Sequence, residues 1–116
     1  MADTAFIFLH GFLGRAETTL AGKTFEYFRG LRSVAREMNV DVSVPQMRSR
    51  VGIDERAIMV RDVIAKIPSA DIILVGNSMG GLVARQAAAH HDPDQRVRAV
   101  ATICTPHRGS PLADRA

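Results

Sequence analysis

The feature that most constrains the fold of this chain is an alternation between short apolar runs and segments of helical periodicity. Residues 5–9 (AFIFL) and 72–75 (IILV) are continuous apolar runs, which is typical of strands buried on both faces of a sheet. Residues 40–44 (VDVSV) alternate with period two, and residues 97–104 form a fourth strand candidate. The segments with apolar side chains at helical spacing are residues 28–38, 53–67 and 79–91.

The resulting order, β-α-β-α-β-α-β, predicts an α/β fold. Strands joined by crossover helices pair in parallel, so we expect a parallel sheet of about four strands with helices on both faces. We expect Asp54 to cap the second helix, Pro68 to end it, and residues 92–94 (DPD) to close the third. Ligands of such sheets bind beyond the carboxyl ends of the strands, so function is expected at that edge.

Composition excludes several classes of protein. The 116 residues fit one domain, and the net charge of +3 comes with arginines that are scattered along the chain. Nucleic-acid binding is therefore disfavoured, because it needs a concentrated basic face. The lone cysteine, Cys104, excludes an internal disulfide, and we expect it to be a small buried thiol. The adjacent His90 and His91 do not form a metal-binding pattern, so no metal site is expected.

The apolar runs are too short to span a bilayer, and the N-terminal residues do not form an ordinary secretory signal. We therefore expect no integral membrane segment. A cytoplasmic location is the default expectation, unless the sequence is a mature or partial form.

Residues 76–80 (GNSMG) match the pattern G-x-S-x-G and lie between a predicted strand and a predicted helix. That is the setting of a nucleophile elbow, a tight turn that presents a serine hydroxyl at the top of the sheet. Gly76 and Gly80 are then required, because any side chain there would collide with the neighbouring strand and helix. The alternative is a plain glycine-rich turn in which Ser78 only caps the helix.

Residues 10–14 (HGFLG) follow the first strand and suggest an oxyanion loop. Acyl transfer needs two preorganised N–H donors for the tetrahedral oxyanion. The residue after the nucleophile, Met79, is one candidate, and Phe12 is the other. Gly11 would let the loop approach a substrate carbonyl, and His10 would support the loop. The alternative is an ordinary glycine turn between a strand and a helix.

Three segments together resemble the α/β-hydrolase superfamily, and within it the bacterial triacylglycerol lipases and related esterases. These segments are residues 10–14 (HGFLG), 73–85 (ILVGNSMGGLVAR) and 105–110 (TPHRGS). The last motif discriminates most, because a T-P-H-x-G-S loop after the next strand is typical of that lipase branch. The resemblance implies that Ser78 is the acylated nucleophile, that Phe12 and Met79 give the oxyanion N–H groups, and that no organic cofactor is needed.

The resemblance also implies a single α/β-hydrolase-like domain over residues 1–116 that stops before the family's triad acid and histidine. The family order is serine, acid, histidine, and the last two follow later strands. His107 is the one tempting substitute for the base, although its motif favours a residue that orders a loop. His90 and His91 lie at the far end of the third helix. The aspartates Asp92 and Asp94 are expected to end that helix, and Asp114 lies near the chain end.

The sequence thus predicts a serine ester hydrolase of the lipase/esterase type, acting on an ester or lipid-like small molecule through an acyl intermediate on Ser78. Two alternatives stay open: a non-catalytic α/β-hydrolase-like protein that binds acyl ligands or a partner chain, and an acyltransferase or thioesterase with the same elbow. If the family strand order holds, the four strands lie in the order second, first, third, fourth across the sheet, and the fourth strand is an open edge. The isolated chain is therefore expected to self-associate through Val97, Val100 and Ile103.

Overall fold

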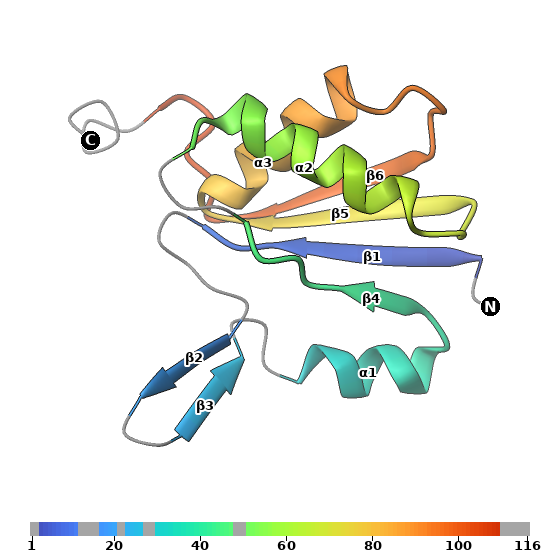
Figure 1. Cartoon of the computed structure of the whole chain (residues 1–116), viewed down its shortest axis with the longest axis vertical. Helices are drawn as coiled ribbons and strands as arrows, with labels where there is room; N and C mark the ends of the chain where they lie inside the picture. Colours follow the sequence, from blue (N-terminus) through green and yellow to red (C-terminus); the bar gives the residue numbers. More distant parts are fainter. Residues whose placement is uncertain (1–2, 12–16, 21–22, 27–29, 48–50, 110–116) are drawn as a thin grey trace.

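The computed structural model describes residues 3–11, 17–20, 23–26, 30–47 and 51–109. Its main sheet has four parallel strands in the order β4-β1-β5-β6 (Figure 1). The strands are β1 (Thr4–Leu9), β4 (Asp41–Ser43), β5 (Asp71–Asn77) and β6 (Val97–Ile103). The α/β fold class and the predicted strand order are confirmed.

The helices are α1 (Leu31–Met38), α2 (Ile53–Ala65) and α3 (Met79–His90). Helices α2 and α3 pack against each other, and α3 packs on β5 and β6, whereas α1 contacts β4 (Figure 1). Alternation of side chains along a strand directs one set of β1 and β5 residues towards α2 and α3. The resulting core consists mainly of Ala5, Ile7, Leu9, Ala57, Val60, Ile64, Ile72, Leu74, Val83, Ala84 and Ala87.

A second, two-stranded antiparallel sheet was not predicted. It consists of β2 (Glu17–Leu20) and β3 (Lys23–Glu26). The strand sequences ETTL and KTFE contain one apolar residue each, so they carry no period-two signal. The pairing of two such short strands depends on contacts between the strands, which the periodicity of a single segment does not predict.

The expected cap of α2 was wrong. Helix α2 begins at Ile53 with Gly52 as its N-cap, so Asp54 lies within the first turn and makes no capping bond. Its carboxylate instead accepts hydrogen bonds from Gln86 Nε2 at 2.9 Å and His91 Nε2 at 2.6 Å. Asp54 therefore ties the start of α2 to the end of α3.

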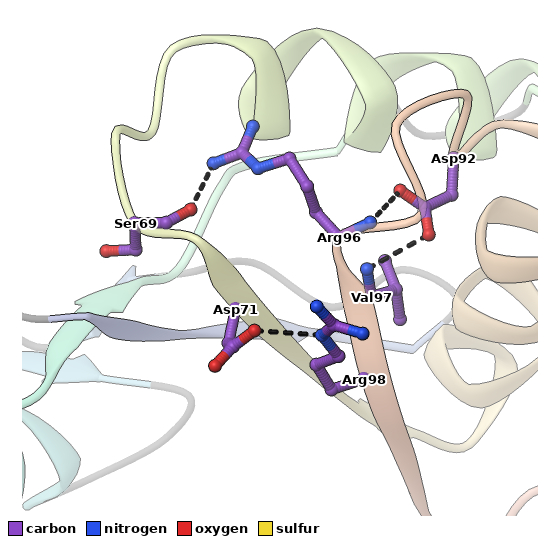
Figure 2. Close-up of polar contacts among 6 residues, drawn as sticks. All are labelled: Ser69, Asp71, Asp92, Arg96, Val97 and Arg98. Atoms are coloured by element: carbon purple, nitrogen blue, oxygen red, sulfur yellow. Dashed lines mark hydrogen bonds and ion pairs between the residues drawn. The ribbon is translucent and has the colours of Figure 1, made fainter.

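The C-terminal end of α2 is capped from a distant part of the chain. Figure 2 shows the Arg96 side chain reaching from the start of β6 towards the segment that carries Ser69. The guanidinium donates to the carbonyl oxygens of Ile64, Ile67 and Ser69. The last carbonyls of a helix lack partners within the helix and carry a partial negative charge. Because α2 has no basic residue in its last turn, Arg96 supplies both the donors and the charge.

Two further contacts fix the start of β6 (Figure 2). The Asp92 carboxylate accepts the backbone N–H groups of Arg96 and Val97, both at 2.9 Å. Arg98 Nε donates to Asp71 Oδ1 at 2.8 Å and so joins β6 to β5. Asp92 thus organises the turn after α3, in keeping with its expected place at the end of that helix. Among the described helices, none is long and apolar enough to cross a membrane.

Candidate active site

Ser78 lies at the sharp turn between β5 and α3, in a strained backbone conformation. Its φ of 55° and ψ of −123° fall outside the regions that residues with a side chain normally adopt. Surrounding contacts hold this geometry, because Ser78 N–H donates to Ile103 C=O at 2.8 Å and Gly81 N–H donates to Ser78 C=O at 3.1 Å. Ser78 occupies the N-cap position of α3, yet its side chain makes no capping hydrogen bond. A capping role therefore does not explain the residue.

The glycines on either side permit a very close backbone approach. A Cβ on Gly76 would lie 2.3 Å from the Gly80 carbonyl oxygen, and a Cβ on Gly80 would lie 2.2 Å from the Leu9 carbonyl oxygen. Both distances are far inside van der Waals contact, so no side chain fits at either position. The turn is consequently packed against the end of β1, where the predicted oxyanion loop starts.

The loop after β1 touches the serine itself. A Cβ on Gly11 would lie 3.0 Å from Ser78 Cβ and 3.5 Å from Ser78 Oγ. Met79 is the first residue of α3, so its N–H has no partner within the helix and lies at the positive end of the helix dipole. Phe12, the other predicted N–H donor, lies outside the described residues.

His10 joins the loop after β1 to the loop after β4. Its side chain is buried, and Nε2 accepts the Met47 N–H at 3.1 Å with the Gln46 amide nitrogen 3.4 Å away. Because Nε2 accepts, the proton resides on Nδ1, which donates to Gly11 C=O at 3.1 Å. Burial lowers the pKa of His10, and the positive charge of Arg56 lowers it further, against the opposing effect of the Gly11 hydrogen bond. A neutral His10 therefore supports the loop.

Arg56 is a residue of this region that the sequence analysis missed. It is only 1% exposed, and its Nε donates to Val51 C=O at 3.3 Å. Burial lowers the pKa of the guanidinium, and among the described residues no carboxylate pairs with it. The sequence could have indicated this burial. Arg56 lies three residues after Ile53 and four before Val60, and so on the apolar side of α2.

The contacts of His107 argue against a role as the catalytic base. Its Nδ1 lies 2.8 Å from Arg85 Nη1, and its Nε2 lies 3.1 Å from Thr102 Oγ1. Arginine only donates, so Nδ1 is the acceptor and Nε2–H donates to the threonine hydroxyl. Both ring nitrogens are thus occupied by the loop's own contacts, which favours the loop-ordering interpretation. No side chain in the described part of the chain hydrogen-bonds the Ser78 hydroxyl.

The expected burial of Cys104 was wrong. The thiol is exposed, because β6 ends at Ile103 and the chain turns at Cys104 with a φ of 51°. This turn directs the following loop against α3, where a Cβ on Gly81 would lie 2.0 Å from Thr105 Oγ1. The T-P-H loop is therefore packed beside the serine turn.

The other candidate groups lie elsewhere. His91 is bound to Asp54 at the far end of α3, and Asp114 lies outside the described residues. Within the described ranges, no three histidine, cysteine, aspartate or glutamate side chains gather as a metal site would require.

The chain is similar to proteins of a known family. The family model for the alpha/beta hydrolase fold matches residues 4–116. The chain belongs to the α/β-hydrolase family. Two curated relatives of this chain are triacylglycerol lipases, from Pseudarthrobacter phenanthrenivorans and Burkholderia plantarii. Each is 33% identical over 115 residues, which cover 93% of this chain but 34% and 31% of the respective lipase.

Over a shorter stretch, the chain is similar to the GPI inositol-deacylase of Candida albicans, with 46% identity over 46 residues, or 40% of this chain and 12% of that protein. Among solved structures, the mature Bacillus licheniformis lipase BlEst2 superposes with a TM-score of 0.74 and 26% identity, over 94% of this chain and 43% of that chain. An extracellular alpha/beta-hydrolase from a Paenibacillus species, at 20% identity and a TM-score of 0.66, shares the fold. The chain thus spans about a third of the length of its lipase relatives.

Proposed function

We propose that this chain carries the nucleophile of a serine ester hydrolase of the lipase/esterase type. The single observation that carries the proposal is the strained Ser78, at φ 55° and ψ −123°, in a turn between strand and helix that no larger residue than glycine could flank. A strained serine at a strand-to-helix turn is the arrangement that presents a hydroxyl for attack in α/β-hydrolases. Membership in that family supports the same assignment.

In the proposed reaction, Ser78 Oγ attacks the carbonyl carbon of a carboxylic ester while a base removes the hydroxyl proton. The carbonyl oxygen becomes an oxyanion, which the N–H groups of Met79 and Phe12 would stabilise. The base then returns its proton to the departing alcohol, which leaves an acyl group on Ser78, and water releases the acid by the same steps. Loss of one oxyanion donor typically lowers the rate about 10²–10³-fold.

The described residues do not supply the base that this reaction needs. His10 is occupied by Met47 and Gly11, and His107 by Arg85 and Thr102. We therefore assign the acid and the base to polypeptide that corresponds to the remaining length of the lipase relatives, of which this chain covers 34% and 31%.

The names of the relatives support a proposal for the substrate class. Two are triacylglycerol lipases, and a third is a GPI inositol-deacylase. We propose that the substrate is likewise a lipid-like carboxylic ester.

A fluorophosphonate probe tests the proposal, because it reacts with an activated serine. The 116-residue chain should react slowly or not at all, whereas a version extended to the length of its relatives should react quickly at Ser78. Ser78→Ala should abolish the reaction in both. Rapid reaction of the short chain that survives Ser78→Ala would contradict the assignment, and rapid reaction lost in His107→Ala would make His107 the base.

A non-catalytic acyl-binding protein is the second candidate. The observation that favours it is the absence of a hydrogen-bonded base on Ser78 within the described residues. It would bind a non-hydrolysable acyl ligand at the same edge of the sheet, and the extended version would then stay unreactive towards the probe.

A further inference from the structure

Arg56 is a buried cation to which the proposed reaction gives no role. It lies near the start of α2 (Ile53–Ala65) and is 1% exposed. Charged side chains are rarely buried to this extent unless an opposite charge pairs with them. Within the described ranges, no carboxylate forms an ion pair with Arg56. A buried charge without a counter-charge acts strongly on neighbouring groups, because little solvent screens it.

Arg56 and His10 hold the two ends of the connection between β4 and α2. At one end, the Met47 N–H donates to His10 Nε2 at 3.1 Å. At the other end, Arg56 Nε donates to the Val51 carbonyl at 3.3 Å. Both Met47 and His10 are buried. The connection is thus tied to the end of β1 at Met47 and to α2 at Val51.

His10 also fixes the Gly11 carbonyl in the loop after β1, since its Nδ1–H donates to that oxygen at 3.1 Å. In a trans peptide the carbonyl oxygen and the next N–H point in opposite directions, so a bond to one restricts the direction of the other. These contacts need one protonation state of the imidazole. Nδ1 must carry a proton, and Nε2 must not, because it accepts the Met47 N–H.

A second proton on His10 would disrupt this arrangement. The imidazolium Nε2–H would face the Met47 N–H, so that two donors would oppose each other, and a second positive charge would lie near Arg56. Burial lowers the pKa of His10 most, and the charge of Arg56 lowers it further, while the Gly11 hydrogen bond raises it. Of the charged side chains in the described ranges, Arg56 is the one that acts on His10 in this way. Arg56 therefore opposes the protonation of His10.

We propose that Arg56 is a positioning residue for the oxyanion loop: it keeps His10 in the neutral Nδ1–H form that fixes the Gly11 carbonyl and, with it, the N–H that follows. The inference rests on the proposed function, which uses that N–H as an oxyanion donor. The guanidinium acts through His10 and does not contact the substrate. The competing explanation is that Arg56 only packs α2 against the sheet, and His10 would then titrate independently of it.

Histidine ring ¹⁵N NMR of the purified 116-residue chain gives the first test, since it needs no catalysis. At about pH 7 the His10 signals should be those of the neutral Nδ1–H tautomer. Arg56→Gln removes the charge, so it should raise the pH at which His10 titrates. Arg56→Lys keeps the charge and should preserve the low midpoint. The control is Arg61→Gln, because Arg61 lies on the exposed side of α2, and it should leave the midpoint unchanged.

The rate of the fluorophosphonate reaction at Ser78 gives the second test, in the version extended to the length of its relatives. The ratio of the wild-type rate to the Arg56→Gln rate cancels the titration of the base, because both proteins share that base. This ratio should be largest between the His10 midpoints of the two proteins. Its upper limit is about 10²–10³-fold, the usual effect of one lost oxyanion donor.

Three results would overturn the proposal: an Nε2–H tautomer of His10, a His10 midpoint that Arg56→Gln leaves unchanged, or a rate ratio that does not vary with pH. If Arg56→Gln does not fold, a raised midpoint in Arg56→Lys would overturn it equally. The NMR results do not depend on catalysis. An unreactive Ser78 with a raised His10 midpoint in Arg56→Gln would therefore contradict the proposed function and still support the action of Arg56 on His10.

Discussion

At the scale of single residues, the turn around Ser78 has no room for a Cβ on its glycines. At Gly80 the new atom would lie 2.2 Å from the Leu9 carbonyl oxygen, so Gly80→Val must displace α3 from β1. We expect a loss of about 1–3 kcal/mol or more in the free energy of unfolding, from overpacking. The control is Gly52→Ala, where nothing lies within 4 Å and φ is −70°. A urea midpoint of Gly80→Val equal to that of the control would contradict the tight turn.

The buried His10 makes stability depend on pH. Burial lowers its pKa in the folded chain below the ordinary 6.5, and Nε2 must stay unprotonated to accept the Met47 N–H. Between these two pKa values the unfolded chain binds more protons, so stability falls as the pH drops below about 6.5. Comparison of urea midpoints at about pH 7.5 and pH 5 should reveal this step.

The matched variants are His10→Gln and His90→Gln. His10→Gln should remove the pH-dependent step, whatever it does to stability overall, whereas replacement of the exposed His90 at the end of α3 should preserve it. An unchanged step in His10→Gln would assign the pH dependence to another group.

The G-x-S-x-G spacing predicted Ser78 and its glycines as a group because it lies between a predicted strand and a predicted helix, which is the setting of a tight strand-to-helix turn. The same reasoning gave no partners for His107, since Arg85 lies 22 residues away in sequence and meets it only in the folded chain. It also missed Arg56, because arginine is ordinarily assigned to the surface. Side-chain partners across elements are set by packing, which periodicity does not encode.

At the scale of elements, the strongly periodic segments were predicted and the short polar ones were not. Strands β1 and β5 contain continuous apolar runs, and helices α2 and α3 carry apolar side chains at helical spacing. Their positions could therefore be predicted from the sequence. The β2–β3 hairpin has no such pattern. Helix ends depend on individual backbone contacts, which is why Asp54 was misplaced as the cap of α2.

The capping of α2 by Arg96 leads to a prediction about stability. Arg96→Met would leave the carbonyls of Ile64, Ile67 and Ser69 without their charged donor. Partly buried polar groups that lose a charged partner cost about 1–3 kcal/mol. Arg98→Met is the control, because its ion pair with Asp71 is exposed and contributes less than about 1 kcal/mol. Chemical denaturation should therefore show a clearly larger loss for Arg96→Met, and equal losses would argue against the cap.

At the scale of the whole molecule, burial falls off from the centre of the sheet to its edges. The core is built from β1, β5, α2 and α3. At one edge β6 is exposed along almost its whole length, and beside the other edge α1 exposes Val34 and Met38, at 50% and 62%. The sheet thus has a well-buried centre and exposed apolar side chains at both of its edges, in a chain that covers about a third of the length of its lipase relatives.

This gradient predicts the pattern of backbone hydrogen exchange. Amides in β1 and β5 bond between two neighbouring strands, so they should exchange slowest, close to the rate set by global unfolding. In β6, the Ile103 carbonyl accepts the Ser78 N–H, so Ile103 bonds towards β5. Alternate residues of a parallel strand bond to the same neighbour, so the Ala101 N–H also points to β5, whereas the Val100 and Thr102 N–H groups point away from it. In dilute protein we therefore expect Val100 and Thr102 to exchange much faster than Ala101, as measured residue by residue by NMR. Equal exchange rates at the three positions would contradict this assignment of the hydrogen bonds.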